Sequence, residues 1–178
     1  MKTTDPQDEL FDVVDKKDNI IGATTRSIAN KNKNLIHRAV TVLVFKSNEL
    51  LVQRRSGTKD TYPNYWTSSC SGHVLAGDTY EPSAIRELEE ELGVFRKGLT
   101  FLKKKIIRYP SETECMSFYA VNLKKEETIQ INKREISEFK FLKLNKTILS
   151  NFIKSEKVTP DFEYAISILN NNFELIRR

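Results

Sequence analysis

The stretch from Gly72 to Val94 decides the fold of this chain. It reads Gly72-His73-Val74-Leu75-Ala76-Gly77-Asp78, then seven residues, then Arg86-Glu87-Leu88-Glu89-Glu90-Glu91-Leu92-Gly93-Val94. At 3.6 residues per turn, Glu87, Glu90 and Glu91 fall within an arc of about 100° on a helix, and Leu88 and Leu92 fall on a different arc, as is typical of a face packed on a core. Because clustered carboxylates repel one another and Mg²⁺ prefers carboxylate ligands, the spacing predicts a metal-binding helix.

The same residues resemble the Nudix box, whose pattern is Gly, five residues, Glu, seven residues, Arg-Glu-apolar-any-Glu-Glu-any-Gly-apolar. Every fixed position matches except one, where Asp78 stands in place of the first Glu. The resemblance implies the Nudix fold, an α/β/α sandwich with a mixed β-sheet, a catalytic loop–helix–loop and C-terminal helices. It also implies hydrolysis of a diphosphate linked to another group, at a metal held by the acids of the helix.

Asp78 has a second interpretation. Asp78-Thr79-Tyr80-Glu81 has the form of a helix-capping signal, and Pro82 suits a first helical turn. Asp78 could therefore only begin the helix. A solvated helix face is the usual explanation of a run of acids; it suits Glu89 and accounts poorly for the spacing of the other three.

Composition bounds the class of protein. With 178 residues and 39% hydrophobic content, we expect a single domain over residues 1–178, with a flexible segment over 1–8. The chain has no run of 18 apolar residues and no signal-peptide pattern at its start, and its two cysteines form no disulfide framework. These features predict a cytoplasmic protein that does not bind a membrane. The net charge of +5 comes without a nucleic-acid-binding motif, so we expect small polyanions and no nucleic acid as partners.

The rest of the chain predicts several strands and two C-terminal helices. Ala39–Phe45 is a continuous β-branched and apolar run, typical of a central strand buried on both sides. The other strands are expected at residues 11–14, 20–25, 50–54, 67–69, 73–75, 99–108, 117–123, 128–131 and 139–142. A helix capped by Asn145 is expected over Lys146–Ser155, and Pro160 begins a last helix with Phe162, Ala165, Ile166 and Leu169 on its core face.

Outside the box, the chain is similar to type I isopentenyl-diphosphate isomerases and the Nudix hydrolases closest to them. The likeness is carried by residues 9–15, His37-Arg38-Ala39, residues 51–55, Lys59 with Pro63 and Trp66-Thr67, and Glu112-Thr113-Glu114. The isomerase needs a cysteine immediately before Gly72-His73, where this chain has Ser71; on a strand, the neighbouring Cys70 points to the opposite face. The resemblance implies a metal site of five residues in the isomerase; His37, His73, Glu112 and Glu114 match four of them, and the fifth, a histidine, is here Asn30. The resemblance therefore favours the hydrolases, and the isomerase is the alternative.

The resemblance assigns candidate roles residue by residue. The metal ligands are Glu87, Glu90, Glu91 and Glu112; the catalytic groups are Glu90, Glu91, Glu114 and Arg86; the substrate contacts are Arg26, Arg55, Lys59, His73 and His37; and the structural positions of the motif are Gly72, Asp78 and Gly93. The two glycines are expected to allow the tight turns of the loop–helix–loop. Arg86 is expected to pair with an acid of the motif. Of the adjacent Arg54 and Arg55, the alignment favours Arg55 as the one facing the site. For His37, a structural role in the core is an equal alternative.

The sequence thus predicts a hydrolase, dependent on Mg²⁺ or Mn²⁺, in which water attacks phosphorus of a small-molecule diphosphate. A possible homodimer is the only protein partner expected. A non-catalytic module that binds a nucleotide or an RNA end is a second alternative, and the intact set of acids argues against it.

Overall fold

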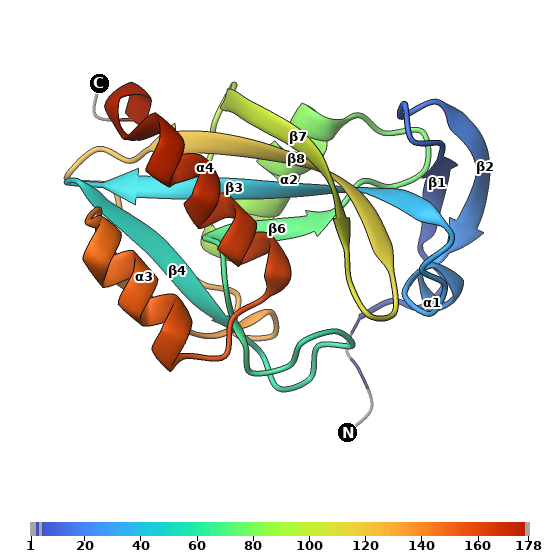
Figure 1. Ribbon diagram of the computed structural model, residues 1–178, viewed down its shortest axis with the longest axis horizontal. Coiled ribbons are helices and arrows are strands. Elements are labelled where there is room, and N and C mark those ends of the chain that lie inside the picture. Colours follow the sequence, from blue (N-terminus) through green and yellow to red (C-terminus); the bar gives the residue numbers. More distant parts are fainter. Residues whose placement is uncertain (1–2, 4, 177–178) are drawn as a thin grey trace.

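The strand expected to be buried on both sides is the centre of the sheet. Strand β3 (Ile36–Lys46) pairs antiparallel with β1, β4 and β6 and parallel with β8. The computed structural model describes residues 3 and 5–176 (Figure 1). Its strands are β1 (Leu10–Val14), β2 (Ile20–Thr25), β3, β4 (Glu49–Arg55), β5 (Trp66–Thr67), β6 (Cys70–His73), β7 (Thr100–Arg108), β8 (Thr113–Asn122) and β9 (Ile136–Lys143), and its helices are α1 (Arg26–Ala29), α2 (Tyr80–Leu92), α3 (Lys146–Ser155) and α4 (Pro160–Ile176).

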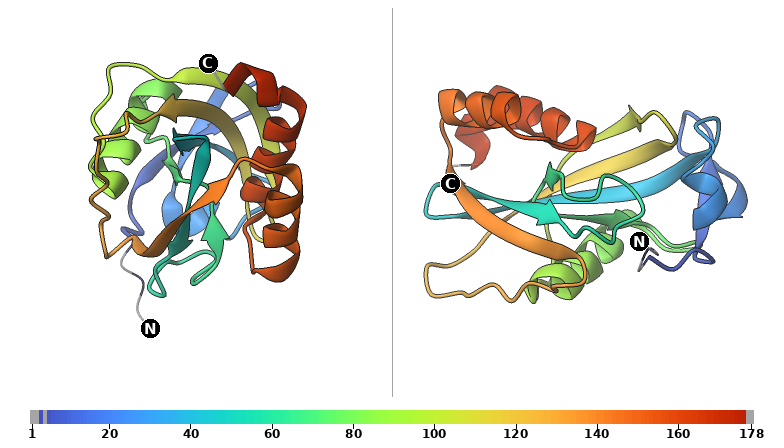
Figure 2. Two further views of the ribbon diagram at one scale, coloured as in Figure 1. Left: turned by 90° about the vertical axis from the view of Figure 1, so that its left-hand side faces the viewer. Right: turned by 90° about the horizontal axis from the view of Figure 1, so that it is seen from below.

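Helices cover both faces of this mixed sheet. Seen from below, α3 and α4 lie on one side of the strands and α2 lies on the other (Figure 2). The alternation of side chains along β3 divides the core accordingly: Leu43 and Phe45 join the cluster under α3 and α4, whereas Val42 and Val44 join the cluster under α2. The predicted α/β/α sandwich is confirmed.

The C-terminal helices begin where the sequence predicts. The Asn145 side chain accepts hydrogen bonds from the backbone N–H of Thr147 and Ile148, at 2.9 and 3.2 Å, which satisfies two donors that a helix leaves free at its start. Helix α4 begins at Pro160. Its predicted core residues Phe162, Ala165, Ile166 and Leu169 are all buried.

Three of the predicted strands are wrong in part or entirely. Residues 128–131 form no strand; instead, Gln130 and Asn132 donate backbone hydrogen bonds to the C-terminal carbonyls of α2, at 2.9 Å each. The strand expected over 67–69 ends at Thr67. Beyond it, the Ser69 hydroxyl donates to the Leu51 carbonyl of β4 at 2.6 Å, in place of a backbone N–H of a continued strand. The strand expected over 73–75 is shifted to Cys70–His73. The short helix α1 was not predicted.

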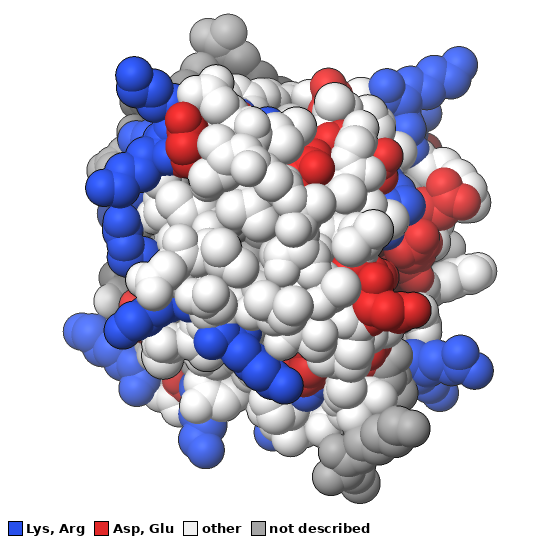
Figure 3. Space-filling view, turned by 90° about the vertical axis from the view of Figure 1, so that its right-hand side faces the viewer, with Lys and Arg blue, Asp and Glu red and all other residues white. Residues whose placement is uncertain are grey.

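The end of the molecule formed by β1, β2 and α1 has an apolar face. Leu10, Ile20, Ile21 and Ile28 are each more than half exposed there, and the centre of this face is largely uncharged, with Lys, Arg, Asp and Glu around it (Figure 3). Within the described residues, no helix has the length and apolar character needed to cross a bilayer.

Part of the segment expected to be flexible is packed on the domain. Of residues 1–8, the structure describes residue 3 and residues 5–8. Asp5 among them is 6% exposed, and its carboxylate accepts a hydrogen bond from the backbone N–H of Asp60 at 2.8 Å.

Candidate active site

Helix α2 presents its acids to a cavity of about 310 Å³. Glu87, Glu90 and Glu91 all line this cavity, while Leu88 and Leu92 are fully buried in the core beneath the helix. The three acids differ in exposure: the Glu90 side chain is 56% exposed, whereas Glu91 is buried. The predicted division of the helix into an acidic face and a core face is therefore present.

Burial changes the ionisation of two of these acids. Burial, followed by repulsion from Glu91, raises the pKa of Glu87 to about 8. Burial also raises the pKa of Glu91 to about 7, against the opposing effects of Lys59 and of a 2.8 Å hydrogen bond from the Gln53 side chain. Without a cation, the cavity therefore favours protons on these groups, and a bound cation would displace them.

Arg86 connects the acids to the strand beside them. One guanidinium nitrogen lies 2.8 Å from Glu87 and 3.1 Å from Glu90, and the other donates to the His73 carbonyl at 3.1 Å. The expected pairing of Arg86 with an acid of the motif is present. It fixes the rotamers of Glu87 and Glu90 relative to β6.

The two glycines of the motif have different structural roles. Gly93 ends α2 in the left-handed conformation, with φ +65°, as expected for a helix C-cap. Gly72 was expected to allow a tight turn, but its requirement is close approach: a Cβ there would lie 2.1 Å from Cδ of Glu87. Because Gly72 has no side chain, the Glu87 carboxylate can pack against its Cα.

Asp78 neither caps the helix nor faces the cavity. The N-cap is Thr79, with no side-chain capping bond, so the capping interpretation of Asp78 is wrong. Asp78 is exposed, does not line the cavity, and its backbone N–H donates to the Leu75 carbonyl at 3.0 Å. Asp78 therefore contributes neither a helix cap nor a side chain to the cavity.

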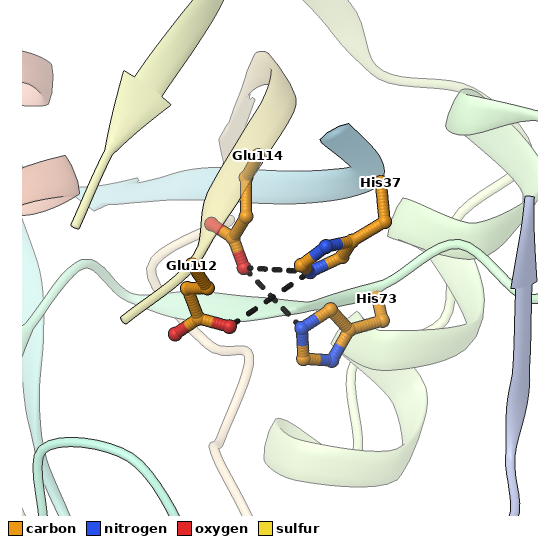
Figure 4. Close-up of side chains that lie close together, drawn as sticks. All are labelled: His37, His73, Glu112 and Glu114. Atoms are coloured by element: carbon orange, nitrogen blue, oxygen red, sulfur yellow. Dashed lines mark ion pairs between the residues drawn. The ribbon is translucent and has the colours of Figure 1, made fainter. Parts of the chain in front are cut away.

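A second cluster, His37, His73, Glu112 and Glu114, brings one ligand atom from each residue within 4.8 Å of the others (Figure 4). Nε2 of His37 lies 3.6 Å from Glu114 and 3.9 Å from Glu112, and Nε2 of His73 lies 3.2 Å from Glu114. The nitrogens of His37, Nε2 of His73 and one oxygen of Glu112 are buried without a hydrogen-bond partner. Such a set of unsatisfied imidazole and carboxylate atoms fits a divalent cation.

The ionisation of this cluster also fits a cation site. Burial lowers the pKa of His73 to about 4, which keeps the imidazole neutral. Burial and the neighbouring Glu114 raise the pKa of Glu112 to about 9. For Glu114, its contacts with His37 and His73 outweigh burial and lower the pKa. His37 is fully buried and is not on the cavity wall, so its expected contact with substrate is not supported by its position.

Two of the predicted substrate-binding cations are already neutralised. Arg26 is buried and pairs with Asp5, Glu9 and Asp60 at 3.3, 2.9 and 2.8 Å. Lys59 pairs with Asp5 and with Glu135, the latter at 2.6 Å. Both cations line the cavity, but each already has carboxylate partners.

Arg55 differs from these two residues. Its guanidinium donates only to Thr61, to the carbonyl at 3.0 Å and the hydroxyl at 3.3 Å, and within the described part of the chain it forms no ion pair. Arg55 lines the cavity and Arg54 does not. The choice of Arg55 over Arg54 thus agrees with the structure.

Sequence reasoning missed several residues that line or support the cavity. They are Asp5, Glu9, Glu135, Tyr62, Tyr109 and Asp161 on its wall, and Gln53 behind Glu91. Most lie far in sequence from the motif, in segments without a pattern. Glu9 and Gln53 lie in two of the segments that carry the resemblance, and Gln53 is also a polar residue on the buried run of β4.

The sequence and the fold of this chain are similar to those of known proteins. A family model described as the NUDIX domain matches residues 35–162. The uncharacterized Nudix hydrolase PA4841 of Pseudomonas aeruginosa is 36% identical over 137 residues, covering 76% of this chain and 79% of that protein. Isopentenyl-diphosphate Delta-isomerase 2 of Photorhabdus laumondii is 34% identical over 146 residues, covering 78% of this chain and 80% of that protein. The crystal structure of DR0079 from Deinococcus radiodurans superposes with a TM-score of 0.70 at 24% identity, over 89% of this chain and 98% of that chain, and shares the fold.

Proposed function

The chain belongs to the Nudix family of hydrolases acting on phosphorus-containing anhydrides, and we propose that it uses Mg²⁺ or Mn²⁺ to hydrolyse a diphosphate-containing small molecule. One observation carries the proposal. Nine acidic side chains and four basic ones line a single cavity, and the motif acids of α2, Glu87, Glu90 and Glu91, are among them. A polyanionic substrate would enter such a cavity only together with cations.

The acids of α2 and the cluster of His37, His73, Glu112 and Glu114 have different roles in the proposed reaction. Glu87, Glu90 and Glu91 would hold a cation, and the cluster of His37, His73, Glu112 and Glu114 fits a further one. When bound, a divalent cation neutralises phosphate oxygens and lowers the pKa of its water. Glu90 or Glu91 would accept the proton of the attacking water, with Glu114 as the alternative acceptor. Arg86 holds Glu87 and Glu90 in place.

The isomerase is the alternative, since several relatives carry that name and the second cluster matches four of its five ligand positions. The side chains on β6 argue against it. Ser71 lines the cavity, and Cys70 does not; Cys70 is fully buried in the core under α2, where burial raises the pKa of its thiol. A serine hydroxyl is a far weaker acid than a thiol and would not supply the isomerase's acid–base step.

A product screen tests the proposal. The protein is incubated with Mg²⁺ or Mn²⁺ and with nucleotides, nucleotide sugars and isopentenyl diphosphate. Metal-dependent release of phosphate or of a phosphorylated product supports the hydrolase. Conversion of isopentenyl diphosphate to its allylic isomer without phosphate release would support the isomerase, and saturable binding without any product would support a non-catalytic module.

Arg55 is expected to contribute to substrate binding. Replacing it by Ala should raise KM by about 10- to 100-fold, because a hydrogen-bonded contact with a charged group is worth roughly 1.5–3 kcal/mol. Steady-state kinetics on the substrate found in the screen measures this change. Arg54→Ala is the matched control and should leave KM unchanged, since Arg54 is exposed and lies off the cavity. Equal effects of the two variants would contradict the assignment.

The metal-free protein should lose thermal stability as the pH rises from about 5 to about 8. Over this window the folded state retains protons on Glu91 and Glu87, whose pKa values are about 7 and about 8. In an unfolded chain these protons have been released near the ordinary Glu pKa of 4.5. The state that binds more protons is disfavoured as pH rises, so folding weakens. Because Mg²⁺ binds the ionised acids, it should raise Tm more at pH 8 than at pH 5.5 in thermal melts. An equal gain at both pH values would show that these acids do not hold the cation.

Two further expectations stay predictions. Location in the cytoplasm is consistent with Cys70 and Cys115 being free thiols. For the homodimer, the exposed Leu10, Ile20, Ile21 and Ile28 are the candidate contact.

A further inference from the structure

Asp161 is a buried carboxylate on the cavity wall that the hydrolytic motif does not use. It is the second residue of α4 and is only 5% exposed, yet it lines the cavity. Within the described part of the chain, no Lys or Arg forms an ion pair with it. A carboxylate in this situation needs hydrogen-bond donors.

Asp161 has hydrogen-bond donors close to it: the Thr67 hydroxyl, and also Thr159 and its own backbone N–H, whose hydrogen bonds act to lower its pKa. The Thr159 hydroxyl donates to the Thr67 hydroxyl at 2.9 Å, and the Thr67 hydroxyl donates to Asp161 at 3.4 Å. An O–H···O bond is usually 2.5–3.0 Å long, roughly, so the bond from Thr67 is a weak one. An ionised carboxylate has about four acceptor positions, which leaves capacity for donors within the cavity.

The position of Asp161 at the start of α4 does not explain why its side chain is buried. An acid in the first turn of a helix is stabilised by the helix dipole, but that effect does not require burial. Glu163 lies in the same first turn and is exposed, so it interacts with the dipole without desolvation. Burial raises the pKa of Asp161, which is a cost that an exposed acid would avoid.

Two tyrosines extend the cavity wall near Asp161, and one of them is held in an unusual conformation. Tyr62 and Tyr109 both line the cavity, with their ring centroids 5.8 Å apart. Tyr62 has a φ of 47°, a left-handed conformation that bulky residues rarely adopt. Such conformations persist where the surrounding structure holds them, often at ligand sites. This side of the cavity wall therefore combines the rings of Tyr62 and Tyr109 with the hydrogen-bond acceptor Asp161.

We infer that Asp161 determines specificity by accepting hydrogen bonds from hydroxyl or amino groups on the organic part of the substrate. This inference rests on the proposed hydrolase function and refines it. An alkyl diphosphate would desolvate Asp161 without supplying a donor, and sites built for such hydrogen bonds reject analogues that lack them. Asp161 thus selects sugar- or nucleoside-bearing diphosphates against isoprenoid ones.

The test compares Asp161→Leu and Asp161→Asn with wild type on three compounds: a nucleoside diphosphate, a sugar-bearing diphosphate and isopentenyl diphosphate. Binding is measured by calorimetry and hydrolysis by product release, both with Mg²⁺. We expect Asp161→Leu to weaken binding of at least one donor-bearing compound by about tenfold or more. The same variant should bind isopentenyl diphosphate as tightly as wild type does, or more tightly. Asp161→Asn, which keeps one acceptor, should fall between the two. The two polar compounds show whether a nucleoside or a sugar supplies the donors.

Glu163→Leu is the matched control on the exposed side of the same turn and should change none of these affinities. Thermal melts establish whether each variant is folded. If Asp161→Leu does not fold, Asp161→Asn provides the test. The inference is overturned if Asp161 variants weaken all three compounds equally, or if wild type binds isopentenyl diphosphate as tightly as the polar compounds. Selective binding without product release would instead overturn the hydrolase while leaving the role of Asp161 intact.

Discussion

Replacing Glu90 by Gln is expected to lower kcat by about 10²- to 10⁴-fold, the range for loss of a group that transfers a proton in the rate-limiting step. Glu90 lines the cavity, and its side chain is the most exposed of the three motif acids. Gln keeps the size of the side chain and removes the charge, so the fold should be unaffected. Steady-state product release measures kcat, and calorimetric titration with Mn²⁺ measures the accompanying loss of cation affinity.

Glu89→Gln is a closely matched control for this variant. Glu89 is adjacent on the same helix, is exposed and does not line the cavity, and its replacement changes the net charge by the same amount. Its kcat and cation affinity should equal those of wild type. If Glu90→Gln retained wild-type activity, Glu91 or Glu114 would be the proton acceptor, and Glu87 and Glu91 would be enough to hold the cation.

The sequence was most informative where the physical cause is local. The helix over Lys146–Ser155 begins at the predicted residue because the cap on Asn145 involves the next three residues only. Ser71 faces the cavity while Cys70 enters the core, as the two-residue alternation of a strand requires. Both the fold class and the argument against an isomerase depend on such short-range rules.

Long-range pairing could not be predicted in the same way. Arg26 and Lys59 were expected to bind the diphosphate, and nothing near them in sequence indicated that Asp5 would reach Lys59 across 54 residues. The segment 128–131 has the composition of a strand, but its backbone pairs with the end of α2. Asp161 carried no signal because its position in the cavity depends on the packing of α4 against β5. In each case the decisive partner comes from a distant element of the fold.

The structural role of Gly72 leads to the second large expected effect. Gly72→Ala should lower activity by about 10²-fold, because a Cβ at this position would lie 2.1 Å from Cδ and 2.4 Å from both carboxylate oxygens of Glu87. Misplacing a group of the site by about 1 Å can cost this much. The Glu87 carboxylate is the end of a flexible side chain and can rotate away, so we expect a stability loss no greater than the ~1–3 kcal/mol of ordinary overpacking. Product release and thermal melts on the same samples separate the two effects.

Gly22→Ala and a double-mutant cycle distinguish this explanation from a general effect of alanine. A Cβ at Gly22 would meet nothing within 4 Å, and Gly22 does not have a positive φ, so Gly22→Ala should leave activity unchanged. In a Glu87→Ala background the collision no longer exists. If Gly72 acts only by making room for Glu87, adding Gly72→Ala to Glu87→Ala should lower activity no further, because the two changes remove the same interaction. An additional 10²-fold loss in the double variant would mean that the backbone at Gly72 acts on the substrate directly and not through Glu87.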